Sequence, residues 1–242
     1  MNREVLLVSS PFAGPGEPFS NQNRFLDRLR ISLTDCKKLL LITSDPENVE
    51  FTQGFFDAIY YTMEHSDIKI PEYDILDARN MADADKLVFD SACIVLAGGH
   101  VPTQNRFFEE IGLRDLLQDY HGVIMGISAG SMNSADVVYA QPEEEGEGID
   151  PKYKRFLVGL NLTKSMILPH YQDTKDRMLD GKRVFEDITY PDSFGREFYA
   201  LPDGSYLSIR DEKEIICGEA YLIKDGHCEK ICSDNEEYAV RK

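Results

Sequence analysis

The sequence predicts an α/β fold of three layers, in which a mostly parallel sheet has helices on both faces. Short apolar runs alternate with longer amphipathic segments along the first 130 residues. The apolar runs are almost continuous, which is typical of parallel strands that are buried on both faces. Hydrophobic residues make up 42% of the 242 residues, which is sufficient for a substantial core. No linker or repeat interrupts the pattern, so residues 1–242 are expected to form one domain.

Five apolar runs are predicted to be strands, and three amphipathic segments are predicted to be helices between them. The strands are expected at residues 4–9, 39–43, 73–77, 93–97 and 122–127. Each helix begins at a capping residue and carries apolar residues at helical spacing, so that these share one face. The first helix is capped by Ser20 and carries Phe25, Leu29 and Leu33. The second begins at Asp45-Pro46 and carries Phe55, Ile59 and Met63. The third is capped by Thr103 and carries Phe107, Phe108, Ile111 and Leu116.

The pattern changes after about residue 195. The turn dipeptides Asp203-Gly204 and Asp225-Gly226 separate β-type runs at residues 206–210, 215–218 and 221–224. Such turns favour hairpins, so antiparallel strands are expected at the edge of the same domain.

Charge and cysteine content restrict the class of protein. The 43 acidic and 26 basic residues give a net charge of −17, which argues against nucleic acid or an anionic membrane surface as a partner. The first apolar run is too short for a signal peptide or a membrane span. The five cysteines are scattered and odd in number, so a reducing cytoplasm is expected. His227-Cys228 with Cys232 resembles half of a metal site, but no second pair accompanies it, and no metal is expected.

The segment Gly126-Ile127-Ser128-Ala129-Gly130 carries the clearest chemistry. It follows a predicted strand and matches the G-x-S-x-G pattern of a nucleophile elbow, a sharp strand-to-helix turn that exposes a serine hydroxyl. The backbone N–H of Ala129 would then be one donor of an oxyanion hole. The alternative is a glycine-rich turn in which Ser128 only caps a helix.

A serine nucleophile needs a base, and His170 is the best of five histidines. It ends the apolar run at residues 166–169, so it lies at a strand end, where the sites of open α/β sheets gather. His65 and His227 are expected to be solvated, and His121 lies at the far end of the strand that leads to Ser128. His100 follows Gly98-Gly99 at another strand end and is expected to line the substrate pocket.

The paired glycines Gly98 and Gly99 allow the backbone to approach a ligand closely. The N–H of Gly99 is therefore a candidate for the second oxyanion donor. The alternative, an ordinary tight turn, is equally compatible with the pair alone.

Three blocks together resemble peptidase family S51, the serine peptidases that include dipeptidase E and cyanophycinase. They are Leu96-Ala97-Gly98-Gly99, Gly126-Ile127-Ser128-Ala129-Gly130 and Leu168-Pro169-His170-Tyr171, with a weaker block at Leu201-Pro202-Asp203-Gly204. The blocks extend over most of the chain in the order found in the family. The resemblance implies a fold like that of class I glutamine amidotransferases.

The resemblance also implies site residues. Ser128 would be the nucleophile, His170 the general base, and the N–H groups of Gly99 and Ala129 the oxyanion hole. In the dipeptidase E branch the acid follows the serine by about fifteen residues, which leads to Glu143 here. The other acids that remain open for this role are Asp136, Glu144, Glu145, Glu147 and Asp173.

The chain departs from the dipeptidase branch in the pocket. The block His100-Val101-Pro102-Thr103-Gln104 replaces a Gly-Asn-Thr block, so specificity for an amino-terminal aspartate does not follow, and His100 and Gln104 are the expected pocket residues. The acidic segment between Ser128 and His170 is expected to repel carboxylate-rich substrates and to favour a basic or free-amine group.

The sequence therefore predicts a cytoplasmic serine hydrolase that cleaves a small peptide or isopeptide bond without a metal or organic cofactor. The alternative from another class is a non-catalytic protein that binds a small ligand on the same fold. A glutamine amidotransferase is disfavoured because its elbow carries cysteine. An α/β-hydrolase esterase is disfavoured because His170 follows Ser128 by only 42 residues. A monomer and a homodimer both remain open.

Overall fold

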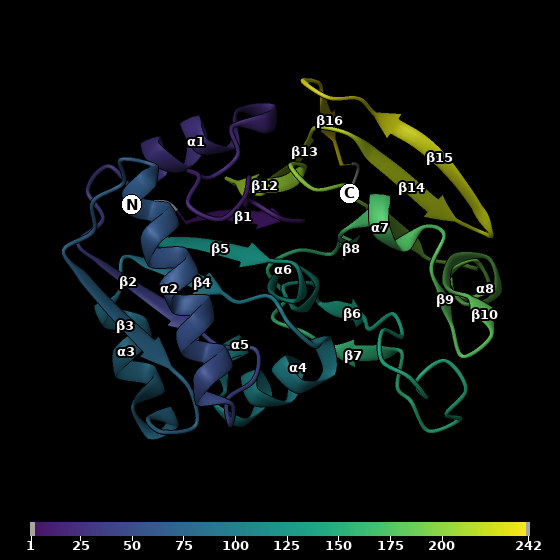
Figure 1. The fold of residues 1–242 in the computed structure, drawn as a ribbon, viewed down its shortest axis with the longest axis horizontal. Helices are drawn as coiled ribbons and strands as arrows, with labels where there is room; N and C mark the ends of the chain where they lie inside the picture. Colours follow the sequence, from purple (N-terminus) through teal and green to yellow (C-terminus); the bar gives the residue numbers. More distant parts are fainter. Residues whose placement is uncertain (1–2, 241–242) are drawn as a thin grey trace.

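The computed structural model describes residues 3–240 and contains a large sheet between two layers of helices (Figure 1). Within these residues the sheet has eight strands in the order β16-β13-β12-β1-β5-β4-β2-β3. The last five strands in that order are parallel to one another. They are β1 (Glu4–Val8), β5 (Val123–Ile127), β4 (Cys93–Leu96), β2 (Lys38–Ile42) and β3 (Glu72–Leu76). The prediction of these five strands is confirmed, and each end lies within one residue of its expected place.

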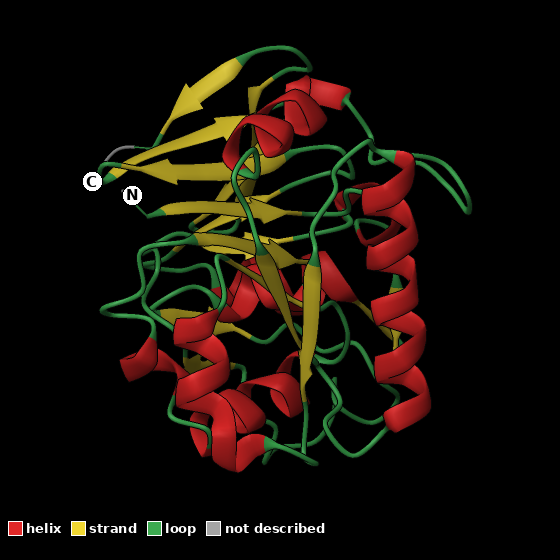
Figure 2. Ribbon diagram, turned by 90° about the vertical axis from the view of Figure 1, so that its left-hand side faces the viewer, coloured by secondary structure: helices red, strands yellow, loops and turns green. Residues whose placement is uncertain are grey.

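The two faces of the parallel strands are covered by different helices. Side chains alternate along a strand, so Leu39 and Leu41 of β2 pack with α1 and α2, while Leu40 and Ile42 pack with α3, α4 and α5. Figure 2 shows helices on both sides of the strands. The predicted three-layer α/β fold is thus confirmed. The helices are α1 (Phe25–Ser32), α2 (Val49–His65), α3 (Ala84–Asp90), α4 (Val101–Glu110) and α5 (Leu113–Leu116).

The predicted starts of all three helices are wrong. Helix α1 begins at Phe25, after a 3-10 turn at Gln22–Arg24, and not after Ser20. Helix α2 begins after Asn48, whose Oδ1 accepts a hydrogen bond from the Phe51 N–H at 3.1 Å, and not at Asp45-Pro46. Helix α4 begins at Val101 and ends before Gly112, which has φ 63° and separates α4 from α5. Within residues 3–240 no helix has the length and apolar composition needed to cross a membrane.

The carboxyl-terminal strands are divided between two sheets. β12 (Tyr206–Arg210) and β13 (Lys213–Cys217) extend the large sheet as antiparallel strands beyond β1, as predicted. β16 (Glu237–Ala239), which was not predicted, pairs with β13 and ends the sheet. β14 (Ala220–Lys224) instead joins β8 (Met166–Leu168), β11 (Glu197–Ala200) and β15 (His227–Cys232) in a sheet of order β15-β14-β11-β8. The prediction did not separate these two sheets, because the hairpins of one sheet resemble those of the other in sequence.

The remaining elements are short. They are the strand pairs β6 (Val137–Tyr139) with β7 (Phe156–Val158) and β9 (Met178–Leu179) with β10 (Lys182–Arg183), the helices α6 (Ala129–Asn133), α7 (Tyr171–Thr174) and α8 (Tyr190–Asp192), the 3-10 turns η1 (Gln22–Arg24) and η2 (Met81–Asp83), and the π-helix η3 (Val184–Thr189).

Strand register brings several loops to one edge of the large sheet. Val8 at the end of β1 lies opposite Ile127 of β5, and Leu96 at the end of β4 lies opposite Gly126. In the second sheet β11 is parallel to β8, and Ala200 lies opposite Leu168. Figure 1 shows α6, which follows β5, close to β8 and α7. The segments after β1, β4, β5, β8 and β11 can therefore form one site.

Candidate active site

Ser128 lies in a sharp turn between β5 and α6. Its backbone has φ 50° and ψ −110°, a strained conformation for a residue that is not glycine. A Cβ at Gly130 would lie 2.3 Å from the carbonyl oxygen of Leu96, so the turn packs closely against β4. The backbone N–H of Ser128 donates a hydrogen bond to the Val8 carbonyl at 3.1 Å and fixes the turn to β1. These features are those of a nucleophile elbow.

His170 meets Ser128 from the second sheet. It follows β8 and has a left-handed backbone conformation with φ 54°, which begins α7. Its Nε2 lies 2.9 Å from Ser128 Oγ. The structure thus brings these two predicted residues within hydrogen-bond distance, where His170 could accept the hydroxyl proton.

The carboxylate that contacts His170 is Asp203, not Glu143. Asp203 lies in the turn between β11 and β12, and its Oδ1 is 2.8 Å from His170 Nδ1. The expectation for Glu143 is corrected, because its Oε1 accepts a hydrogen bond from the Val101 N–H at 3.2 Å, at the start of α4. Among the other acids considered, Asp136 pairs with a lysine and an arginine, and Glu147 pairs with a different histidine.

Ser9 holds Asp203 and His170 together. It follows β1, is fully buried, and donates a hydrogen bond from Oγ to Asp203 Oδ1 at 2.7 Å. The same Oγ accepts a hydrogen bond from the His170 backbone N–H at 2.7 Å. Burial by itself would raise the pKa of Asp203, but the hydrogen bonds from His170 and Ser9 outweigh it and lower that pKa. The carboxylate is thus kept ionised beside the imidazole.

A signal for Asp203 was present in the sequence. It belongs to the weaker block Leu201-Pro202-Asp203-Gly204, although the Asp203-Gly204 pair by itself indicates only a turn. The missing information is that β11 pairs in parallel with β8. That pairing makes residues that follow Ala200 neighbours of residues that follow Leu168, and so brings Asp203 to His170.

The two expected oxyanion donors have no competing partner. Within residues 3–240 neither the Gly99 N–H nor the Ala129 N–H donates a hydrogen bond to the protein. Ser128 lies beside the first of the paired glycines, since a Cβ at Gly98 would lie 3.4 Å from Ser128 Cβ. Both N–H groups are therefore free to bind the oxygen of a substrate.

The two expected pocket residues have different surroundings. His100 is partly exposed, and its Nε2 lies 2.8 Å from Glu147 Oε1. Gln104 is completely buried, and its Nε2 donates a hydrogen bond to the Ala97 carbonyl at 2.7 Å. The expectation that Gln104 lines the pocket is corrected, because it lies on the inward face of α4 and supports the loop after β4.

One group among the described residues has the side chains that a metal ion prefers. Ligand atoms of His100, Glu144 and Glu147 lie within 4.8 Å of one another. Glu144 is exposed, and His100 and Glu147 already bind each other. The hydrogen bond accounts for their arrangement.

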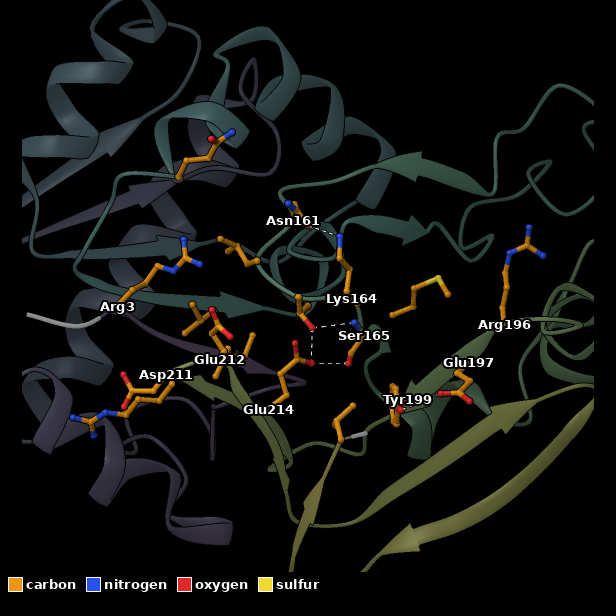
Figure 3. A pocket seen from close by; sticks show the side chains of 18 of the residues that line it. Arg3, Asn161, Lys164, Ser165, Arg196, Glu197, Tyr199, Asp211, Glu212 and Glu214 are labelled. Carbon is orange, nitrogen blue, oxygen red and sulfur yellow. Dashed lines mark hydrogen bonds between the residues drawn. The ribbon is translucent and has the colours of Figure 1, made fainter. Parts of the chain in front are cut away.

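A cavity lies at the opposite end of the sheet. It has a volume of about 1360 Å³ and is lined by residues that precede β1 and β5, including Arg3 and His121. Figure 3 shows Ser165 bonded to Glu214 inside it, with the Ser165 Oγ donating to Glu214 Oε2 at 2.8 Å. A strand of five residues spans about 16 Å, so this cavity is separate from Ser128. His121 lines this cavity, so it lies at the end of β5 that is far from Ser128 and cannot act as the base.

Comparisons with known proteins bear on the fold and the family of the chain. The search of curated proteins gave no match. Among solved structures, a peptidase from an acI-B1 Actinobacterium has a TM-score of 0.66 at 16% identity, with 99% of this chain and 98% of that chain covered. A candidate peptidase E protein from Listeria monocytogenes EGD-e has a TM-score of 0.60 at 15% identity, with 89% of this chain and 98% of that chain covered. These two likenesses show the fold. The model of peptidase family S51 matches residues 44–217, so the chain belongs to peptidase family S51.

Proposed function

We propose that the protein is a serine peptidase in which Ser128 is the nucleophile, His170 the general base and Asp203 the acid that orients the imidazole. One observation carries this proposal: Ser128 Oγ lies 2.9 Å from His170 Nε2, and the other ring nitrogen lies 2.8 Å from Asp203. The order serine, base, orienting acid is the arrangement that activates a hydroxyl for acyl transfer.

The reaction would proceed in two stages. Ser128 Oγ attacks the peptide carbonyl carbon while His170 Nε2 takes its proton, and the N–H groups of Gly99 and Ala129 bind the resulting oxyanion. His170 then gives the proton to the leaving amine, the C–N bond breaks, and an ester to Ser128 remains. Water attacks this ester with His170 again as base, which releases the acid product and restores the hydroxyl. Each proton is returned, so the cycle needs no cofactor.

The substrate is proposed to be a small peptide or isopeptide with a free amino group near the cleaved bond. Two carboxylates flank the residues that follow Gly99: Glu147 contacts His100 at 2.8 Å, and Glu143 contacts the Val101 N–H at 3.2 Å. An anionic wall beside the oxyanion donor attracts an ammonium group and repels a carboxylate.

Labelling with a fluorophosphonate tests the catalytic proposal without a known substrate. The reagent should modify the protein at Ser128, as located by peptide mapping, and the Ser128→Ala variant should not react. Turnover of any peptide substrate should fall at least several hundred-fold in that variant, because the triad acts as a unit. Unchanged turnover in Ser128→Ala would contradict the proposal.

A peptide panel tests the substrate class. Peptides with a free amino terminus should be cleaved faster than their acetylated forms, and Glu147→Gln should reduce this preference by roughly tenfold, or about 1.4 kcal/mol. Glu145→Gln is the matched control, because Glu145 is exposed on the same loop. Equal cleavage of free and acetylated peptides would exclude amine recognition.

A further inference from the structure

Ser44 lies directly against the paired glycines of the site. It follows β2, is 1% exposed, and donates a hydrogen bond from Oγ to the Gly98 carbonyl oxygen at 2.5 Å. A Cβ at Gly99 would lie 2.2 Å from Ser44 Oγ, so no residue larger than glycine fits at this position beside Ser44. Gly99 has φ 150°, a conformation that L side chains rarely adopt. Ser44 therefore contacts the peptide that joins these glycines.

This contact determines the direction of one oxyanion donor. The Gly98–Gly99 peptide is trans, since the described residues contain no cis peptide bond. In a trans peptide the C=O and N–H groups point in opposite directions. A carbonyl held by Ser44 thus turns the Gly99 N–H away from Ser44, into the space where it has no protein partner.

The glycine pair needs such a restraint. Glycine has no side chain to oppose rotation, so a peptide between two glycines can turn over at low cost. The preceding peptide is fixed separately, because Gln104 Nε2 donates to the Ala97 carbonyl at 2.7 Å. Among the side chains of residues 3–240, Ser44 is the one that donates a hydrogen bond to Gly98 O.

We propose that Ser44 is a positioning residue that holds the Gly98–Gly99 peptide with its N–H toward the substrate oxygen. This inference rests on the proposed serine peptidase function. Ser44 acts through the peptide and does not touch the substrate. Its loss lets the peptide turn, which replaces a donor with a carbonyl oxygen that repels the oxyanion.

The rate of fluorophosphonate labelling measures this effect. Ser128 Oγ displaces fluoride from phosphorus while His170 takes the hydroxyl proton, and the phosphoryl oxygen occupies the oxyanion hole. Two variants test the hydrogen bond: Ser44→Ala removes the hydroxyl, and Ser44→Cys replaces it with a slightly larger thiol that is a weak donor. Ser91→Ala is the control, because Ser91 is also buried and donates to a backbone carbonyl, that of Leu87, at 2.8 Å.

Both Ser44 variants should react about 10- to 100-fold more slowly than the unchanged protein, which is less than the 10²- to 10³-fold loss of a whole donor. With p-nitrophenyl acetate as substrate, kcat should fall while KM and the acid limb of the pH profile stay unchanged. Ser91→Ala should label at the original rate.

Three results would overturn the inference: an unchanged rate in Ser44→Ala, a rate restored by Ser44→Cys, or a shifted pH profile. The rate in Ser44→Cys decides the question if Ser44→Ala does not fold. If the unchanged protein does not label at Ser128, the proposed function fails together with this inference. Normal labelling that is insensitive to Ser44 removes only this inference.

Discussion

Ser9 donates a hydrogen bond to Asp203 at 2.7 Å, although 194 residues separate them in sequence. The same hydroxyl accepts the His170 N–H at 2.7 Å. Ser9 therefore links the proposed base and its acid to the end of β1. We expect Ser9→Ala to lower kcat by roughly 10-fold or more, since a hydrogen bond to a charged group contributes about 1.5–3 kcal/mol.

The measurement is steady-state kinetics across pH. Because the Ser9 hydrogen bond helps to lower the pKa of Asp203, the variant should also lose activity at a higher pH on the acid side. Ser10→Ala is the control, since the backbone oxygen of Ser10, not its hydroxyl, contacts Gly204. Equal kinetics for both variants would remove Ser9 from the site.

Asp203→Asn should lower kcat by about 10³- to 10⁴-fold. The amide cannot stabilise the imidazolium and favours the wrong tautomer of His170. Glu143→Gln should change kcat by no more than a few-fold, because Glu143 contacts Val101 and not His170. The reverse ranking in a direct comparison of the two variants would restore Glu143 as the acid.

Glu143→Gln should raise the melting temperature at pH 7. Burial raises the pKa of Glu143 above its ordinary value of 4.5, and the hydrogen bond from Val101 only partly offsets this. The folded state then holds the proton more tightly than the unfolded state, so stability falls as pH rises through the window above 4.5. Glutamine can still accept the Val101 hydrogen bond and avoids this loss.

The check on Glu143 is thermal unfolding at several pH values. The difference between Glu143→Gln and the unchanged protein should be largest near neutral pH and should disappear below pH 4.5, where the glutamic acid is protonated in both states. Glu145→Gln, on the exposed part of the same loop, is the control and should leave the melting temperature at pH 7 unchanged. If Glu143→Gln instead lowered the melting temperature at pH 7, the predicted direction of the stability change would be wrong.

Gly130→Ala should destabilise the fold by about 1–3 kcal/mol, because the added Cβ would lie 2.3 Å from the Leu96 carbonyl oxygen. Gly54→Ala is the opposite case: Gly54 lies in α2 with open space around it, and alanine there should stabilise by about 0.5–1 kcal/mol. Denaturant unfolding measures both. A neutral Gly130→Ala would show that the elbow is not tightly packed on β4.

The parts of the site that follow single strands could be predicted from sequence. Ser128 and His170 each follow a strand whose apolar run is visible, and both glycine blocks mark places where backbones meet. Asp203 could not be assigned to this role, because it lies where the chain crosses from β11 in the smaller sheet to β12 in the large sheet. The sequence does not show that these two strands belong to different sheets. Glu143 illustrates the same limit, since an offset in sequence cannot specify which way a long loop folds.

The division of the proposed catalytic residues between two sheets has a thermodynamic consequence. Ser9 and Ser128 follow strands of the large sheet, His170 follows a strand of the smaller one, and Asp203 occupies the chain segment that passes from one to the other. A partial unfolding that separates the smaller sheet from the large sheet would abolish hydrolysis while most helices and strands remain folded. Enzymatic inactivation on heating should therefore precede the loss of secondary structure, which makes turnover a sensitive gauge of how firmly the two halves are joined.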